Sequence, residues 1–319
     1  MAYERENEVD EPPENELNAP PEGSATGSSL DERTLPPSVE DGRVEIHGSE
    51  VHYLASGSDG PAIVLLHGGG LDSASVAWKH AIEPLAEEYH VFALDWPGHG
   101  ESEYPEATYS IEYYADVLSS FLDALNVTHT SLVGTGIGGT VALDFALRHP
   151  ERVDRLVLSA SYGLGRDVPG GLSTFGFAYV PGWQRTSYTL RSRSDRALRR
   201  ALESIVADPT EVLPELLADV HENLERPNAG RAFRRFLRAE VGPGGFRRNY
   251  LDRLSELPVP VLFVHGAEDS LVPPERSVRA STLAPDGRIS LLEDCGHWPH
   301  REQPGPFNAL LGSFLSEER

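Results

Sequence analysis

Short apolar runs that alternate with segments of helical periodicity limit most strongly how this chain can fold. The run Ala62–Leu66 (AIVLL) ends in a cluster of glycines, which is typical of a strand buried on both faces of a parallel sheet. The same pattern predicts a hairpin at 43–47 and 51–55 and further strands at 90–95, 130–134, 155–159, 259–264 and 289–292. Amphipathic segments of helix length lie between them, at 111–125, 138–148 and 307–315. We therefore predict an α/β fold with a doubly wound, mostly parallel eight-stranded sheet and helices on both faces.

The alternation stops near residue 162 and resumes near residue 256. The intervening segment is helical in pattern and is broken by Pro and Gly, so we predict a helical cap at 162–255 inserted into a core formed by 43–161 and 256–319. The cap holds 15 Arg against 11 Asp and Glu, although the chain as a whole is acidic. Solvated helix faces are the simplest explanation of these arginines.

The first 42 residues have a different composition. They contain 12 Asp and Glu, two Arg and six Pro, with almost no large apolar side chain. Such a segment cannot bury enough apolar surface to offset the entropy lost on ordering. We predict a disordered acidic tail at 1–42.

The charge balance constrains the partners of the protein. Lys and Arg total 27 against 50 Asp and Glu, for a formal net charge of −23, so neither a nucleic acid nor an anionic membrane is expected to bind. Only one basic residue, Lys79, is a lysine. This acid-rich, lysine-poor composition is similar to that of proteins from salt-loving archaea, although a GC-rich genome together with an acidic tail would also account for it.

The compartment and the cofactors can also be predicted. A single cysteine, Cys295, cannot form an internal disulfide, and no cluster of Cys and His has zinc spacing. No apolar run is long enough to span a membrane, and the N-terminus lacks the apolar core of a signal peptide. We expect a cytoplasmic protein that acts on a small molecule without metal or cofactor; the pattern does not indicate an oligomeric state.

The loops that follow the predicted strands carry the polar residues. In a doubly wound sheet, ligand-binding groups gather at the carboxyl ends of the strands. Four such loops stand out: HGGG at 67–70, WPGHGES at 96–102, HGAEDSLVP at 265–273 and CGHWPH at 295–300.

These four motifs, in this order, resemble those of the α/β-hydrolase family, in particular its lidded esterases, lipases and carbon–carbon-bond hydrolases. The resemblance covers residues 43–318. It implies that the catalytic acid is Asp269, after the strand that follows the cap, and that the catalytic base is His297, after the last strand. It further implies an oxyanion hole formed by the backbone amides of Gly69 and Ile137.

The chemistry of the residues agrees with that assignment. A carboxylate that orients an imidazole selects its tautomer, and the other ring nitrogen can then accept and return a proton near neutral pH. Backbone amides of glycines can approach a developing oxyanion closely. We expect His99 and His300 to be structural.

The sequence departs from the family at the nucleophile. The elbow between strand and helix should read G-x-S-x-G, but residues 134–138 read GTGIG, which puts Gly136 at the nucleophile position. No acyl-enzyme can form on a residue without a side chain. Thr135 is expected to point away from the site, and Cys295 is expected to be a small buried side chain rather than a substitute nucleophile. Glycine relaxes the turn, because the elbow residue has a positive φ that costs other residues on the order of 1 kcal/mol.

Two functions from different classes follow. In the first, Asp269 and His297 activate water or abstract a substrate proton, which would give slow ester or C–C hydrolysis, or lyase or oxygenase chemistry. In the second, the protein is a non-catalytic relative that binds a ligand or a partner in the pocket that serves as the active site in the family. Retention of the His–Asp pair favours the first hypothesis, and the missing nucleophile favours the second. The substrate is not predicted; six aromatic side chains either line an apolar pocket or form the core of the cap: Tyr162, Phe175, Phe177, Tyr179, Trp183 and Tyr188.

Overall fold

The computed structural model describes residues 36–168 and 171–317 of the chain. Most of the predicted tail, residues 1–35, lies outside the described residues. Its predicted end at residue 42 is too late, because strand β1 (Glu40–Ile46) begins within it and pairs Glu40 with Ala55 of β2 (Ser49–Ser56). The sequence predicted the strand only from residue 43, because the first three residues of this edge strand are exposed or half-buried and their composition does not differ from that of the tail.

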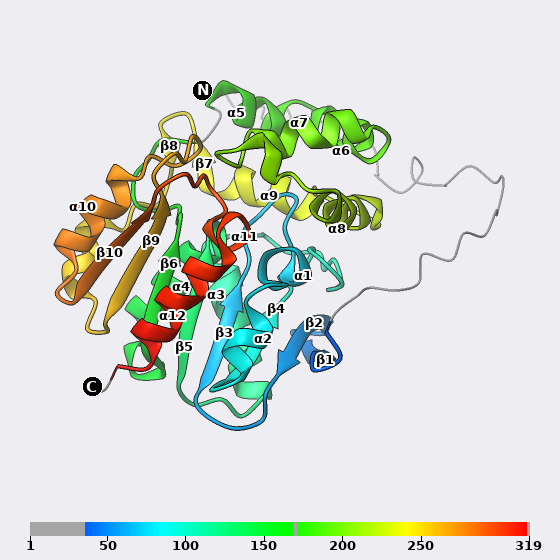
Figure 1. Cartoon of the computed structure of the whole chain (residues 1–319). Helices are drawn as coiled ribbons and strands as arrows, with labels where there is room; N and C mark the ends of the chain where they lie inside the picture. The colour runs from blue at the N-terminus through cyan, green and yellow to red at the C-terminus, as the bar shows by residue number, and fades with distance from the viewer. Residues whose placement is uncertain (1–35, 169–170, 318–319) are drawn as a thin grey trace, which may run out of the picture. The chain divides into compact units, whose positions relative to one another are not determined.

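An eight-stranded sheet organises the fold, as predicted (Figure 1). Its order is β1-β2-β4-β3-β5-β6-β9-β10; β1 and β2 are antiparallel to their neighbours, and all other pairs are parallel. The parallel strands are β3 (Ala62–Leu66), β4 (His90–Leu94), β5 (Thr130–Thr135), β6 (Val153–Ser159), β9 (Val261–Gly266) and β10 (Gly287–Leu292).

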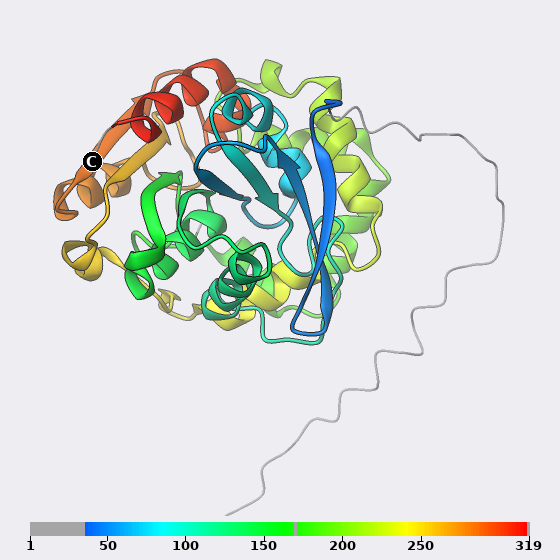
Figure 2. The same ribbon diagram turned by 90° about the horizontal axis from the view of Figure 1, so that it is seen from below.

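Alternate side chains of the central strands pack into two separate apolar layers, one on each face of the sheet. In β3, Val64 and Leu66 face one layer, while Ile63 and Leu65 face the other. The first layer contains α3 (Ile111–Ala124), α4 (Ile137–Arg148) and α10 (Glu275–Leu283), and the second contains α1 (Ala74–Trp78), α2 (Ile82–Ala86) and α12 (Pro304–Leu315). Figure 2 shows the helices on both faces of the sheet. Burial on both faces explains why the β3 sequence is apolar without interruption.

The segment predicted as a cap contributes helices and one short hairpin. The helices are α5 (Leu172–Tyr179), α6 (Trp183–Ser192), α7 (Asp195–Glu203), α8 (Pro214–Glu225) and α9 (Arg231–Glu240), and the hairpin joins β7 (Val241–Gly242) to β8 (Gly245–Phe246). The hairpin forms its own small sheet. Short 3-10 helices lie at Pro150–Arg152, Pro209–Glu211 and Leu251–Glu256, and the four-residue helix α11 (Pro299–Glu302) precedes α12.

The cap helices share a core of their own. Leu198, Leu202, Val220 and other cap side chains pack together, and this cluster also includes Trp298, which follows His297 on the loop after β10. The cap therefore packs directly against the loop that carries His297.

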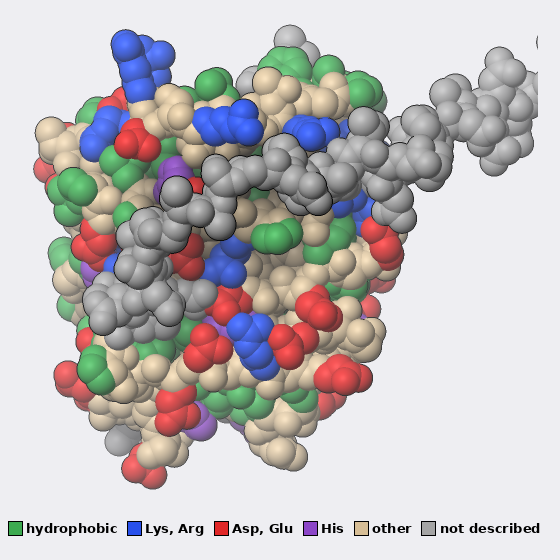
Figure 3. All heavy atoms as spheres, turned by 90° about the vertical axis from the view of Figure 1, so that its right-hand side faces the viewer, with side chains coloured by type: hydrophobic (Ala, Val, Ile, Leu, Met, Phe, Trp, Pro, Cys, Tyr) green, Lys and Arg blue, Asp and Glu red, His purple; other side chains and the backbone are tan. Residues whose placement is uncertain are grey.

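The surface charge differs between the two ends of the molecule. On the face in Figure 3, basic side chains gather toward the cap, and acidic side chains predominate on the surface of the sheet-containing part. Within the described residues, no helix combines the length and apolar character that crossing a membrane requires.

Candidate active site

The turn between β5 and α4 has the backbone of a nucleophile elbow. Gly136 adopts φ +53° and ψ −113°, outside the regions that other residues populate readily. Gly138 is required by close approach, since a Cβ there would lie 2.1 Å from the carbonyl oxygen of Leu66. At Gly136 the situation is different, because a Cβ would lie 3.8 Å from its nearest neighbour, the Cα of Gly68. A Cβ at residue 136 would therefore make only ordinary van der Waals contacts and would fit without a clash.

The two residues predicted as acid and base are brought together. His297 Nδ1 lies 2.8 Å from Asp269 Oδ2, and both side chains are buried. Because a carboxylate accepts hydrogen bonds, Nδ1 carries the proton and Nε2 is left with a free lone pair. Nε2 faces the elbow, 3.9 Å from the position of a Cβ on Gly136. The geometry thus leaves a basic nitrogen pointing at the place of the missing nucleophile.

Several donors hold the carboxylate of Asp269. The backbone amides of Leu271 and Val272 donate to Oδ1, at 2.8 and 3.0 Å. Burial raises the pKa of Asp269, but the hydrogen bonds from His265 and His297 outweigh burial and hold that pKa well below its usual range. Asp269 is therefore ionised at neutral pH and can stabilise a protonated His297.

The structure adds His265, which our sequence analysis did not single out. This buried ring lies between Ser277 Oγ, 2.7 Å from its Nδ1, and Asp269 Oδ2, 3.0 Å from its Nε2. Its Nε2 also lies 2.9 Å from the carbonyl oxygen of Val272, so Nε2 carries the proton and donates. The only sequence signal was its position four residues before Asp269, since His265 lies at the end of β9 and Asp269 in the loop that follows.

The glycine-rich loop after β3 faces the elbow. A Cβ on Gly69 would lie 2.6 Å from Ile137 Cδ1, so this close approach requires glycine. Within the described residues, no hydrogen bond occupies the backbone N–H of Gly69 or of Ile137. These are the two amides predicted to form an oxyanion hole, and both are free to donate.

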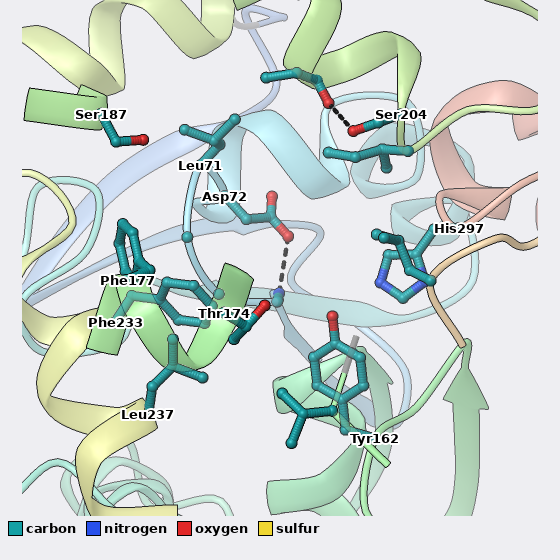
Figure 4. A pocket seen from close by; sticks show the side chains of 18 of the residues that line it. Leu71, Asp72, Tyr162, Thr174, Phe177, Ser187, Ser204, Phe233, Leu237 and His297 are labelled. Carbon is teal, nitrogen blue, oxygen red and sulfur yellow. Dashed lines mark hydrogen bonds between the residues drawn. The ribbon is translucent and has the colours of Figure 1, made fainter. Parts of the chain in front are cut away.

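Asp72 is a second side chain that our sequence analysis missed. Its Oδ2 accepts from the amide of Gly68 at 2.8 Å, and its Oδ1 accepts from the amide of Ser73 at 3.0 Å. Burial nevertheless raises the pKa of Asp72 above its usual value. Figure 4 shows this carboxylate over the glycine loop. It shapes the loop that presents the amide of Gly69.

A cavity of about 330 Å³ lies between the cap and the core, and its lining includes Gly69, Gly136 and His297. Of the six aromatic residues noted in the sequence, Tyr162, Phe177, Trp183 and Tyr188 line it, whereas Phe175 and Tyr179 contact each other outside the lining. The cap is held to the glycine loop by the hydroxyl of Tyr188, which donates to the carbonyl oxygen of Gly70 at 2.9 Å. Figure 4 shows Phe177 and Phe233 on one side of the cavity and His297 on the other.

The remaining sequence candidates, apart from Thr135, do not line the cavity. Cys295 is buried, its pKa is raised by burial, and it does not line the cavity. His99 and His300 are also buried away from the cavity; burial lowers the pKa of His99 to about 3 and that of His300 well below its ordinary value. Both are neutral at pH 7. Thr135 is part of the cavity wall, and its buried hydroxyl has no partner in the described part of the chain.

Comparison with known proteins places this geometry in context. A family model described as alpha/beta hydrolase fold matches residues 61–304. The chain is 30% identical to the 2-hydroxymuconate semialdehyde hydrolase of Pseudomonas sp. strain CF600, over 88% of this chain and 95% of that protein. It is 34% identical to a 2-hydroxy-6-oxononadienedioate/2-hydroxy-6-oxononatrienedioate hydrolase of Burkholderia vietnamiensis, over 87% and 93% of the two chains. A solved structure of the meta-cleavage product hydrolase from Pseudomonas fluorescens IP01 superimposes with a TM-score of 0.73 at 29% identity, covering 86% of this chain and 97% of that one.

Proposed function

The chain belongs to the α/β-hydrolase fold family, and we propose that it is a hydrolase that cleaves a small ester-like or C–C-bond substrate with water as the direct nucleophile. The observation that carries this proposal is the 3.9 Å separation between His297 Nε2 and the Cβ position of Gly136. That space can hold a small group without a clash, adjoins the cavity and is faced by a nitrogen able to accept a proton.

The reaction then proceeds by general-base catalysis. A water above Gly136 gives one proton to His297 Nε2 while its oxygen attacks the substrate carbonyl carbon. The amides of Gly69 and Ile137 donate to the oxygen that becomes negative, and the ionised Asp269 stabilises the imidazolium. His297 returns the proton to the leaving group, which releases a carboxylic acid and an alcohol or carbon acid. No covalent intermediate with the protein forms.

The cavity suggests the class of substrate. Its volume of about 330 Å³ is at the small end for ligand pockets. Arg191 of α6 also lines it and forms no ion pair within the described residues. The Burkholderia relative is named for dienedioate and trienedioate substrates, which carry carboxylates. We infer that Arg191 binds a carboxylate of a substrate that resembles them.

The absence of a side chain at Gly136 also supports a second candidate, a non-catalytic protein that binds such a ligand in the same cavity. The His–Asp hydrogen bond distinguishes the two, because ligand binding alone does not need an imidazole oriented by an ionised carboxylate. Lyase or oxygenase chemistry by the same general base would give products other than a hydrolysed acid.

The test is an assay in concentrated salt of the purified protein and of His297→Ala, with short-chain aryl esters and with a 2-hydroxy-6-oxodienoate. We expect slow turnover to a hydrolysed acid without a burst, lost in His297→Ala. Binding of the dienoate without turnover would support the non-catalytic candidate. Equal hydrolysis by the two proteins, or a burst of covalent intermediate, would refute the water mechanism.

A further inference from the structure

Tyr162 occupies the wall of the cavity beside the elbow. It follows β6, and its backbone N–H donates to the carbonyl oxygen of Gly136 at 3.1 Å. Its ring stacks on the imidazole of His297, with ring centroids 5.7 Å apart and planes 20° apart, and on Phe246 at the same centroid distance. The ring is therefore fixed against the proposed base from one side and against the cap from the other.

The hydroxyl of Tyr162 is unengaged. Figure 4 shows it pointing into the cavity, on the side where the ring of His297 lies. Within the described residues it has no hydrogen-bond partner. Burial raises the pKa of Tyr162 well above its usual value, so the hydroxyl stays neutral and can accept a hydrogen bond as well as donate one. A hydroxyl that faces a cavity without a protein partner is a place for a water or a ligand atom.

The ring edge of Tyr162, next to its hydroxyl, and Nε2 of His297 both border the place of a Cβ on Gly136. A Cβ there would lie 3.9 Å from Tyr162 Cε2 and 3.9 Å from His297 Nε2. We propose that the hydroxyl of Tyr162 and Nε2 of His297 together hold one water in the space that a nucleophile side chain would fill, which makes Tyr162 a catalytic residue. This inference rests on the proposed water mechanism.

The hydrogen bonds of this water fix its reactivity. One hydrogen points to His297 Nε2 and the other to the oxygen of Tyr162, so an oxygen lone pair is left to face the substrate carbonyl carbon. When the C–O bond forms, the O–H bond toward His297 breaks and its proton moves to Nε2. The π electrons of the carbonyl move to the oxygen beside the amides of Gly69 and Ile137. Tyr162 loses and gains no proton.

Asp72 also lines the cavity, but it is less suited to hold the water. Each of its carboxylate oxygens already accepts a backbone N–H, from Gly68 and from Ser73. Tyr162 is thus the better-placed second anchor.

The experiment compares Tyr162→Phe with the unaltered protein and repeats the comparison in a Gly136→Ser background. Phenylalanine keeps the ring that stacks on His297 and removes only the hydroxyl, so the variant is expected to fold. Tyr113→Phe, on α3 and outside the cavity lining, is the matched control. We measure kcat and KM for a hydrolysed substrate and determine crystal structures of the protein and of Tyr162→Phe at a resolution that shows ordered water.

In the chain with Gly136, we expect Tyr162→Phe to lower kcat about five- to tenfold, the effect of one neutral hydrogen bond, with KM unchanged. In the Gly136→Ser background the same change should alter kcat less than about twofold, because the serine oxygen then fills the site of the attacking water. The crystal structure should show a water within hydrogen-bond distance of Tyr162 Oη and His297 Nε2, and it should be lost or displaced in Tyr162→Phe.

Equal losses in the two backgrounds would assign Tyr162 a packing role and overturn the inference, as would an unchanged kcat in both. If the unaltered protein hydrolyses nothing, the proposed function fails separately, and the crystal structures still decide whether Tyr162 holds the water. A cavity without that water would overturn the inference.

Discussion

Placing a serine at residue 136 tests how much of a hydrolase site is already assembled. In Gly136→Ser the new Cβ meets the Cα of Gly68 at 3.8 Å and Nε2 of His297 at 3.9 Å, which are ordinary contacts. Its Oγ can therefore reach Nε2 by rotation about χ1, without movement of the backbone. The partners that a serine needs, namely His297, Asp269 and the free amides of Gly69 and Ile137, are in place.

The magnitude follows from two opposing effects. A side chain at φ +53° costs about 1–2 kcal/mol, which lowers Tm by roughly 2–4 °C per kcal/mol in a domain of this size. The catalytic gain is far larger, because members of a triad act as a unit and most of the rate depends on all of them. We expect ester hydrolysis to rise by about 10³-fold or more over the unaltered protein.

The assay is p-nitrophenyl acetate and butyrate hydrolysis in concentrated salt, with thermal unfolding of each variant. Gly136→Ala is the matched control, because it carries the same backbone cost without the oxygen and should remain as slow as the unaltered protein or slower. The serine variant should also show a burst and react with a fluorophosphonate, unlike the alanine variant. A folded Gly136→Ser protein that is inert toward all of these esters would refute the reasoning that the site lacks only its nucleophile.

Three further predictions concern stability. Asp269→Asn should lower the free energy of unfolding by about 2 kcal/mol at pH 7. Because the pKa of Asp269 is depressed in the folded state, the ionised carboxylate stabilises the protein at pH values above the pKa that it has in the unfolded chain. Urea unfolding should therefore show the stability difference between the variant and the unaltered protein narrowing as the pH falls below about 4, and a constant difference would contradict this. Tyr188→Phe should lower the free energy of unfolding by about 1–2 kcal/mol with an unchanged m-value, since the carbonyl oxygen of Gly70 loses its donor. An unchanged urea midpoint would show that the hydrogen bond between Tyr188 and Gly70 does not contribute to stability. Deleting residues 1–34 should change Tm by less than about 2 °C, whereas deleting residues 1–46 removes β1 and should lower Tm by several degrees. A large decrease in Tm after the shorter deletion would show that the stability of the folded domain depends on residues 1–34.

The sequence by itself determined the strand–helix framework and the order of the motifs. The predicted strand Ala62–Leu66 coincides with β3, because a strand buried on both faces must be apolar at every position. The elbow, Asp269 and His297 were found because each lies on a loop directly after a strand, and parallel strands bring those loops to one edge of the sheet. Order along the chain was enough to predict that they meet.

Only the tertiary structure decided which other groups face the gap at Gly136. Tyr162 shares no motif with His297. Its ring stacks on His297 and on Phe246 because the cap and the residues after β6 pack together at this edge of the sheet. The same packing brings Phe177 of α5 into the cavity and leaves Phe175, two residues earlier, outside the lining. The hydrogen bonds of His265 with Asp269 and of Asp72 with Gly68 each span only four residues, but they depend on the folded backbone of each turn, which residue identity alone does not specify. Periodicity reports which face of an element is buried, whereas the identity of the neighbours on that face depends on contacts between residues that are distant in the chain.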